Sequence, residues 1–242
     1  MFDIESFEAE KEKDILSIRT DDKLQSLGRE FLIKADKLKY AYSWTWLGLP
    51  IIQMPEDILI TQEILWDTKP DFVIEAGIAW GGGIAMYASF LEIMGRGKVF
   101  GIDLTIPLHN RNRIMSLPVS DRIELIEGSS VDQKIYKKIS SEIPQNSNVL
   151  LILDSNHTHD HVLEELKLWS PLITKGNVII VSDTIVESIP EQTHRIRPWG
   201  HGNNPMTAMR AFLENRNDFL ATNKYSDKTV ISYNPSGYLL KK

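Results

Sequence analysis

The sequence contains no cysteine among its 242 residues, so disulfide bonds and thiolate metal sites are excluded. It also lacks an excess of positive charge, because 27 Lys and Arg stand against 33 Asp and Glu, which gives a net charge of −6. A protein that binds a nucleic-acid backbone needs a cationic face. We therefore expect no nucleic-acid partner and look instead for a small-molecule or glycan substrate.

Long apolar runs are also missing. No window approaches the roughly 20 apolar residues that a membrane-spanning helix needs, so we expect no membrane span. Residues 1–22 are acidic and have no apolar core of the kind found in signal peptides. These absences predict a cytoplasmic protein. Hydrophobic residues still make up 42% of the chain, which is enough to bury a large core.

From residue 70 onward, short apolar runs alternate with helix-like segments. The expected strands cover residues 72–75, 98–103, 123–127, 149–154 and 178–182, and the expected helices cover 83–94, 106–115, 133–139 and 158–170. This alternation predicts an α/β fold with a doubly wound, mostly parallel sheet of the Rossmann-like type. Two later strands, 229–233 and 238–241, flank the turn sequence Asn-Pro-Ser-Gly and predict a C-terminal antiparallel hairpin.

The N-terminal part of the chain is different in character. Residues 1–37 are charged, with apolar residues at irregular helical spacing, and predict a helical extension to a domain over 38–242. This extension looks too exposed for a monomer, so we expect a homo-oligomer. An aromatic cluster at 40–46 follows, and then a helix that begins near Pro55 and ends before Pro70.

Acidic residues stand at the ends of four of the five expected parallel strands. They are Glu75, Asp103, Asp154 and Asp183. In open α/β sheets, ligands bind beside the carboxyl ends of the strands, so these acids should meet at one edge of the sheet. The sequence therefore predicts a binding site there.

A glycine-rich turn follows the first of these acids. The turn contains Gly77, Ala79, Gly81, Gly82 and Gly83. A turn that opens a helix offers free N–H groups, but this spacing is not Gly-x-Gly-x-x-Gly, and no Gly-Lys-Ser/Thr motif is present. The acid before the turn would repel phosphate and attract the ammonium or sulfonium group of S-adenosylmethionine. Asp103 would then accept the ribose hydroxyls, Ser129 and Ser130 would line the adenine, and Asp154 would also contact the cofactor. The alternative is a packing turn, with Asp103 as a helix cap.

Asp154, Asp183 and Thr184 together form a candidate oxygen site that suits Mg²⁺. A bound metal could hold substrate oxygens and lower the pKa of a hydroxyl. His157, three residues after Asp154, is our candidate to accept the hydroxyl proton. We interpret His159 and His161 as solvated or packing residues. The alternative reading makes the two aspartates helix N-caps.

A loop rich in helix breakers precedes the helix expected to begin at residue 206. It contains Arg197, Trp199, His201, Asn203 and Asn204, which offer aromatic and hydrogen-bonding groups. Its place beside the fifth strand predicts a lid that contacts the substrate. A purely structural loop is the alternative.

Several of these stretches occur together in a known family. The strings "YSWTWLGLPIIQMPEDI", "VIEAGIAWGGG", "LDSNHTHDHV" and "RPWGHGNNPMTA" resemble the cephalosporin hydroxylase family over residues 38–242. This resemblance implies a methyltransferase fold and an S-adenosylmethionine-dependent, Mg²⁺-dependent O-methyltransferase acting on secondary metabolites, sugars or glycans. It implies the same cofactor residues as above, with Asp154 and Asp183 as metal ligands. Ser182 replaces an acid of some relatives, so Thr184 and water remain alternatives for the third ligand.

Two other functions remain open on the sequence alone. A nicotinamide-dependent oxidoreductase would also use a Rossmann-type sheet, although the glycine spacing serves a pyrophosphate poorly. A non-catalytic partner protein on a methyltransferase fold is the third possibility.

Overall fold

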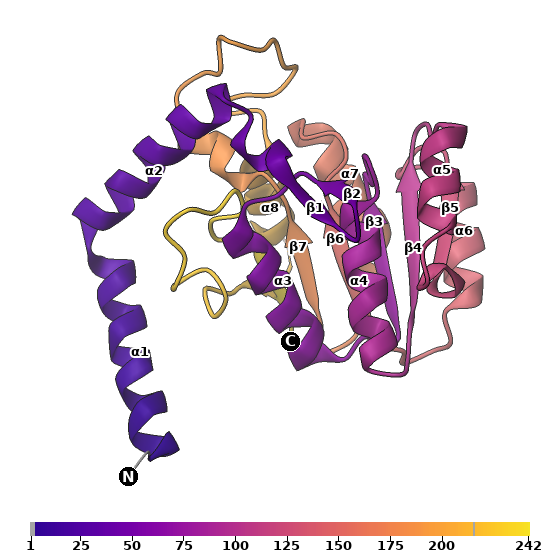
Figure 1. The fold of residues 1–242 in the computed structure, drawn as a ribbon, viewed down its shortest axis with the longest axis horizontal. Helices are drawn as coiled ribbons and strands as arrows, with labels where there is room; N and C mark the ends of the chain where they lie inside the picture. Colours follow the sequence, from indigo (N-terminus) through magenta and orange to yellow (C-terminus); the bar gives the residue numbers. More distant parts are fainter. Residues whose placement is uncertain (1–2, 215) are drawn as a thin grey trace.

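The computed structural model describes residues 3–214 and 216–242, and a seven-stranded sheet runs through its centre (Figure 1). The strand order is β5-β4-β3-β6-β7-β9-β8. The strands are β3 (Phe72–Ala76), β4 (Lys98–Asp103), β5 (Ile123–Glu127), β6 (Val149–Leu153), β7 (Val178–Val181), β8 (Phe219–Ala221) and β9 (Tyr238–Lys241). The first five are parallel, and β9 is antiparallel to both neighbours. The predicted α/β class and doubly wound sheet are confirmed.

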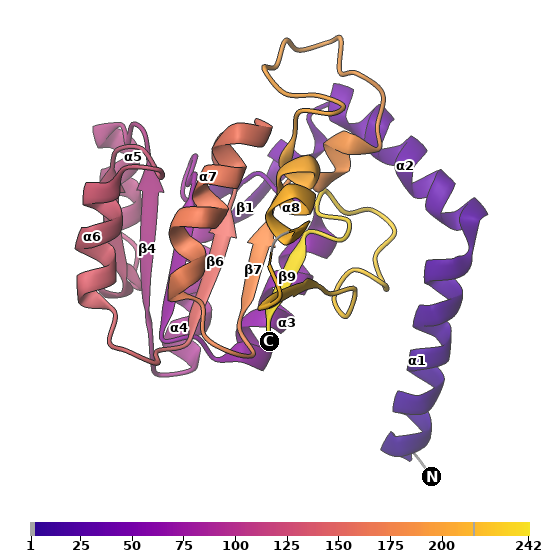
Figure 2. The same cartoon turned by 180° about the vertical axis from the view of Figure 1, so that it is seen from behind.

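Helices cover both faces of the sheet, as the opposite views in Figures 1 and 2 show. One face carries α3 (Pro55–Thr68), α4 (Gly82–Ile93) and α5 (Leu108–Met115), and the other carries α6 (Gln133–Glu142), α7 (His159–Trp169) and α8 (Pro205–Glu214). Successive strand residues point to opposite faces, so Val73 joins the α3–α4 core and Ile74 joins the α6–α8 core. This double burial explains why the central strands are apolar throughout.

The chain order reverses between β3 and β6, which is where a doubly wound sheet opens a crevice. Gly77, directly after β3, has a φ of +89° and lies against the loop after β6. A Cβ atom added to Gly77 would lie 2.2 Å from the carbonyl oxygen of Asp154. Close contact between these two loops therefore requires glycine here.

The predicted strand over residues 229–233 is wrong. The backbone N–H groups of Val230 and Ile231 donate to the Glu56 carboxylate at 2.8 and 3.0 Å, and that of Tyr233 donates to Asp57 at 2.8 Å. These carboxylates at the start of α3 take the donors that a sheet ladder would need. The antiparallel partner of β9 is β8 instead, with Leu220 opposite Leu240, so the hairpin predicted around Asn-Pro-Ser-Gly does not form.

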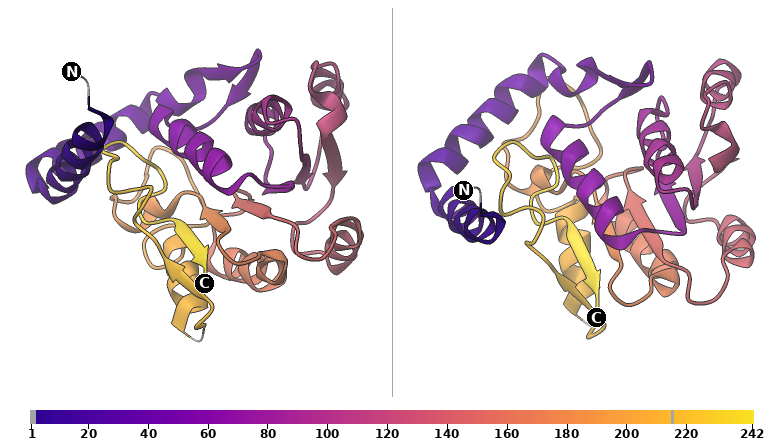
Figure 3. Two further views of the ribbon diagram at one scale, coloured as in Figure 1. Left: turned by 90° about the horizontal axis from the view of Figure 1, so that it is seen from below. Right: turned by 60° about the horizontal axis from the view of Figure 1, so that its bottom comes forward.

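Two helices form the N-terminal end, α1 (Ile4–Thr20) and α2 (Asp22–Lys37). Figures 1 and 3 show α1 standing away from the sheet while α2 leads back toward it. No residue of α1 is buried, whereas Leu32 of α2 packs with Met54 and Ile185. A small antiparallel pair that the sequence did not predict, β1 (Trp44–Trp46) and β2 (Leu49–Ile51), then leads into α3. Among the described residues, no helix is long and apolar enough to cross a membrane.

The remaining glycines of the glycine-rich turn serve packing at the start of α4. Gly81 is the left-handed N-cap, with a φ of +85°. A Cβ atom on Gly82 would lie 2.3 Å from the carbonyl oxygen of Pro50, and one on Gly83 would lie 2.8 Å from the Glu75 carboxylate. These glycines let α4 approach both β2 and the buried acid.

This packing makes a testable prediction for Gly82. The change Gly82→Ala should lower the free energy of unfolding by roughly 2–3 kcal/mol, because the methyl group would overlap backbone atoms of β2. Gly200→Ala is the matched control, since a Cβ atom there meets nothing within 4 Å, and its effect should stay within about 0.5 kcal/mol. Urea denaturation measures both; equal stability of the Gly82 variant and the parent would contradict the packing.

Candidate active site at the carboxyl ends of the strands

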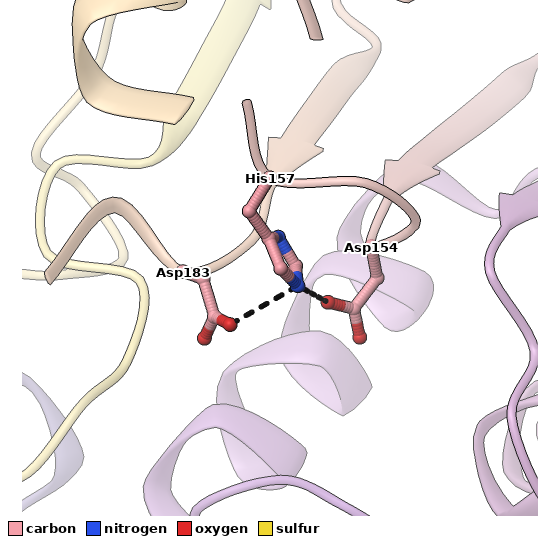
Figure 4. Close-up of side chains that lie close together, drawn as sticks. All are labelled: Asp154, His157 and Asp183. Atoms are coloured by element: carbon pink, nitrogen blue, oxygen red, sulfur yellow. Dashed lines mark ion pairs between the residues drawn. The ribbon is translucent and has the colours of Figure 1, made fainter. Parts of the chain in front are cut away.

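Three predicted residues come together beyond β6 and β7. His157 Nε2 lies 4.0 Å from Asp154 Oδ1 and 3.2 Å from Asp183 Oδ2 (Figure 4). One ligand atom from each residue falls within a group spanning no more than 4.8 Å, which is close enough to hold one metal ion. Only 12% of the His157 side chain is exposed, whereas the two carboxylates are partly open to the cavity, with 25% of Asp154 and 30% of Asp183 exposed.

The electrostatics of this cluster favour a cation. Burial raises the pKa of Asp154 well above its usual range, and the neighbouring carboxyls of Asp183 and Glu75 raise it further. Asp183 sits in the left-handed region with a φ of +58°, held by a hydrogen bond from its N–H to Asn234 Oδ1 at 2.9 Å. A strained acid beside a buried acid is typical of a binding site.

Thr184, the predicted third metal ligand, does not point into this cluster. Its hydroxyl donates to the Pro235 carbonyl at 2.8 Å, and the residue is only 1% exposed. His157, rather than Thr184, is the third residue beside the two carboxylates. The position of His157 three residues after Asp154 correctly predicted that it lies on the loop after β6. From the sequence alone we assigned it a proton-accepting role.

A cavity of about 450 Å³ opens beside Asp154, between the loops after β3, β4, β5 and β6. Six residues predicted to bind the cofactor line it, namely Gly77, Ala79, Asp103, Ser129, Ser130 and Asp154. Asp103 Oδ2 accepts hydrogen bonds from the N–H groups of Ile78 and Ala79 at 3.0 and 3.1 Å. That oxygen ties the β3–α4 loop to β4. Oδ1 accepts only a long hydrogen bond, at 3.4 Å, from the Thr105 N–H, so it is the oxygen available to a ligand.

Glu75 lies beneath the turn rather than on the cavity wall. It is 3% exposed, and Tyr87 donates its hydroxyl to Oε1 at 2.7 Å. Oε2 is shut off from solvent without a hydrogen-bond partner among the described residues. Burial raises the pKa of Glu75 to about 8, an effect only partly offset by the Tyr87 hydrogen bond.

A buried polar network forms one side of the same cavity, and our sequence analysis missed it. The Glu165 side chain is fully buried, and its Oε1 accepts hydrogen bonds from Ser130 Oγ and, at 2.6 Å, from Ser155 Oγ. His161 Nε2 lies 3.3 Å from this carboxylate, whose hydrogen bond raises the pKa of the histidine. We expected His161 to be solvated or to pack, yet it lines the cavity. Its i, i+4 spacing from Glu165 was the available signal.

A second cavity, of about 240 Å³, adjoins the first. The two share four lining residues, which are Ala79, Asp154, Ser155 and Trp199. His157 and Asp183 line only the second cavity. The arrangement thus provides two binding spaces that meet beside Asp154, with the acid–histidine cluster on the side of the smaller one.

The predicted loop contributes to both cavities through Trp199. The edge of this ring packs on His157 with centroids 4.8 Å apart and an interplanar angle of 80°. Arg197 joins it on the wall of the smaller cavity. His201 lies farther out, 80% exposed and 3.8 Å from the Glu187 carboxylate.

The two asparagines of the loop hold its shape. Asn203 Oδ1 accepts from the N–H of His159 at 2.8 Å, which fastens the loop to the start of α7. Asn204 is fully buried and donates to Glu187 at 2.6 Å and to the Gly200 carbonyl at 2.8 Å. These contacts position Trp199 without placing either asparagine on a cavity wall.

The strand order and the acid-lined crevice define a Rossmann-like methyltransferase fold, and comparisons with solved structures agree. A CmcI structure holding Mg and SAM superposes with a TM-score of 0.56 at 19% identity, covering 83% of this chain and 77% of that one. An O-methyltransferase from Bacillus cereus in complex with SAH gives a TM-score of 0.55 at 15% identity, with 92% of each chain covered. At these identities the likeness concerns the fold.

The chain belongs to the Rhamnosyl O-methyltransferase/CmcI family, whose model matches residues 38–242. The predicted resemblance to cephalosporin hydroxylases is thereby confirmed, and the protein is an O-methyltransferase by family. Rhamnosyl O-methyltransferase of Mycobacterium tuberculosis (strain ATCC 25618 / H37Rv) is 29% identical over 205 residues, 81% of this chain and 78% of the relative. The Mycobacterium leprae (strain TN) enzyme of the same name is 27% identical over 203 residues, 82% and 83% of the two chains.

The buried Glu75 predicts a pH-dependent stability. Its pKa in the folded protein, about 8, exceeds the ordinary value of 4.5, so the carboxyl stays protonated in the fold while the unfolded chain ionises. The parent should therefore lose stability as pH rises from about 4.5 to 8, by at most roughly 4–5 kcal/mol. Glu75→Gln cannot ionise and should escape this loss. Urea unfolding of both proteins at pH 5 and 8 measures the difference, and a gap that does not widen with pH would refute the assignment.

Proposed function

We propose that the protein is an S-adenosylmethionine-dependent, Mg²⁺-dependent O-methyltransferase that methylates a hydroxyl of a sugar, a glycan or a secondary metabolite. The observation that carries the proposal is the meeting of two cavities at Asp154, with the other two residues of the acid–histidine cluster in the smaller cavity. Family membership and the names of the rhamnosyl relatives support a sugar hydroxyl as the acceptor.

The larger cavity fits the methyl donor by its chemistry. S-adenosylmethionine supplies a methyl group made electrophilic by a positively charged sulfur. Asp103 offers Oδ1 to the ribose hydroxyls, and Ser129 lines the far end where the adenine would lie. Glu75 lies beneath the loop and does not line this cavity, so it supports the shape of the turn rather than contacting the donor.

The acid–histidine cluster fits a divalent ion. Asp154 and Asp183 supply the hard carboxylate oxygens that suit Mg²⁺, and the buried setting of Asp154 makes an added cation favourable. When bound, such an ion lowers the pKa of a hydroxyl and so makes it a better nucleophile.

His157 is placed to accept the proton of the acceptor hydroxyl. Its Nε2 lies 3.2 Å from Asp183 Oδ2, so the Nε2–H faces this carboxylate and Nδ1 is the nitrogen that would accept the proton. The T-shaped contact with the Trp199 ring restricts the orientation of the imidazole. Trp199 also borders both cavities, so it can keep the acceptor and the methyl donor apart from bulk water. Positioning of the two reactants then accounts for much of the rate enhancement.

One titration separates this proposal from the two alternatives. S-adenosylhomocysteine should bind with micromolar affinity and NAD should not, because the Gly77 turn lacks the dinucleotide spacing. Tighter binding of NAD would favour the oxidoreductase. Binding of S-adenosylhomocysteine without methyl transfer to any sugar or metabolite acceptor would favour the non-catalytic partner.

The exposed N-terminal helix supports a homo-oligomer. α1 buries none of its residues, and Phe7 and Leu16 are 56% and 57% exposed. A second copy of the chain would cover these side chains, and a cytoplasmic location remains part of the same proposal.

The metal assignment predicts a selective defect. Asp183→Asn should weaken Mn²⁺ or Mg²⁺ binding at least tenfold and lower methyl transfer about a hundredfold, because a carboxylate ligand is lost. S-adenosylhomocysteine affinity should change less than twofold, since Asp183 does not line the larger cavity. Calorimetric titrations of metal and cofactor measure both. Glu164→Gln, an exposed acid of α7, is the control, and equal metal affinity in both variants would rule the site out.

The proton-accepting role of His157 makes a separate prediction. His157→Gln should lower kcat roughly a hundredfold, while metal affinity stays within about threefold. Steady-state kinetics and a metal titration of the same variant provide the measurement. A loss of metal affinity as large as that of Asp183→Asn would make His157 a metal ligand instead.

A further inference from the structure

Two arginines line the smaller cavity that holds His157 and Asp183. Arg195 and Arg197 both border it, and both also border a neighbouring cavity of about 300 Å³ beneath the loop. Their positive charges lie in the same space as the acid–histidine cluster. Neither the metal site nor the proton-transfer step proposed above uses them.

The charge of Arg195 is already neutralised. Its guanidinium pairs with the carboxylate of Asp36 from α2 and donates to the Tyr42 hydroxyl at 3.2 Å. Asp36 is only 5% exposed and also accepts hydrogen bonds from Gln192 and His194 at 2.9 and 2.8 Å. This carboxylate therefore fixes the loop and leaves Arg195 in a set position.

Arg197 is arranged differently. Its guanidinium carbon lies 5.1 Å from the centroid of the Trp199 ring, and no carboxylate of the described residues comes within 4.0 Å of its nitrogens. Stacking on an aromatic face orients a guanidinium while leaving its N–H edge available. Because Trp199 also packs on His157, a single ring separates this cation from the proposed proton acceptor.

Arg197 is solvent-exposed at the edge of the cavity, so its unpaired guanidinium can contact an anion that enters. Carboxylate and phosphate groups match its planar fork and can accept two parallel hydrogen bonds from it. Since Asp36 neutralises Arg195, the unpaired positive charge on this wall is that of Arg197. Asp154 and Asp183 would repel the same anion, so Arg197 places it on the loop side of the cavity.

We infer that the methyl acceptor carries a carboxylate or phosphate group, which Arg197 binds beside the methylated hydroxyl. An acidic sugar or a sugar phosphate has this chemistry. The inference rests on the proposed function, because it narrows the acceptor class of that same site.

Calorimetry with simple probes tests this assignment. Glucuronate, glucose 6-phosphate and glucose are titrated into the protein with Mg²⁺ and S-adenosylhomocysteine present. At least one anion should bind about tenfold more tightly than glucose, because charge-assisted hydrogen bonds add to the sugar contacts. The two anions tell a carboxylate site from a phosphate site.

Variants connect the preference to Arg197. Arg197→Gln should abolish the preference for the anion over glucose while leaving glucose affinity unchanged. Arg197→Lys should retain part of this preference, because the positive charge remains but the planar pair of N–H donors is lost. Arg29→Gln, at an exposed arginine of α2 without an ion pair among the described residues, is the control and should keep the full preference. Equal thermal unfolding midpoints confirm that the variants fold.

Three results would overturn the inference. The first is equal affinity for glucose and both anions, and the second is no measurable binding of either anion. The third is a preference for the anion over glucose that survives in Arg197→Gln, because the anion would then bind the metal. If S-adenosylhomocysteine failed to bind the same protein samples, the proposed function itself would be contradicted. A normal cofactor titration without anion preference would remove only this inference.

Discussion

The crowding of carboxyl groups beside the carboxyl ends of β6 and β7 is the constraint on which the site depends. Burial raises the pKa of Asp154 well above its usual range and that of Asp57, at the start of α3, to about 7, and the neighbouring Asp183 raises both further. Such groups cost folding free energy unless a cation or hydrogen bonds compensate them. The fold itself offsets part of this free-energy cost, because the Ser232 hydroxyl and the Tyr233 N–H donate hydrogen bonds to the Asp57 carboxylate. A bound metal ion and a cationic methyl donor would offset the rest.

The surrounding architecture keeps these acids together. Apolar strands packed on both faces fix where β6 and β7 end, and therefore where Asp154 and Asp183 emerge. Glu56 and Asp57 at the start of α3 hold the segment that leads to Asn234, which in turn orients Asp183. From the other side, α2 reaches the loop through Asp36. Helix, loop and C-terminal segment thus meet around one cavity, which couples stability of the fold to the shape of the site.

Much of this could be predicted from residue patterns. Alternating strands and helices predicted the parallel sheet, and acids at strand ends predicted where Asp154, His157 and Asp183 gather. Local sequence patterns gave wrong predictions where contacts with residues far away in the sequence determine the structure. Residues 229–233 have strand-like composition, but the carboxylates at the start of α3 take their N–H groups, and those contacts span about 170 positions. Likewise, the Gly81–Gly83 run resembles a ligand-binding turn, yet its glycines make room for Pro50 and Glu75. The hydrogen bonds of Ser130 and Ser155 to Glu165 became visible only once α7 was placed beside the loops after β5 and β6.

The most direct test of the central claim is a crystal structure of the protein with Mn²⁺ and S-adenosylhomocysteine, measured for anomalous scattering. The account predicts one strong manganese peak within bonding distance of the carboxylates of Asp154 and Asp183, with the cofactor in the cavity beside Asp103. A manganese peak elsewhere, or carboxylates that keep their metal-free arrangement beside a bound cofactor, would contradict it.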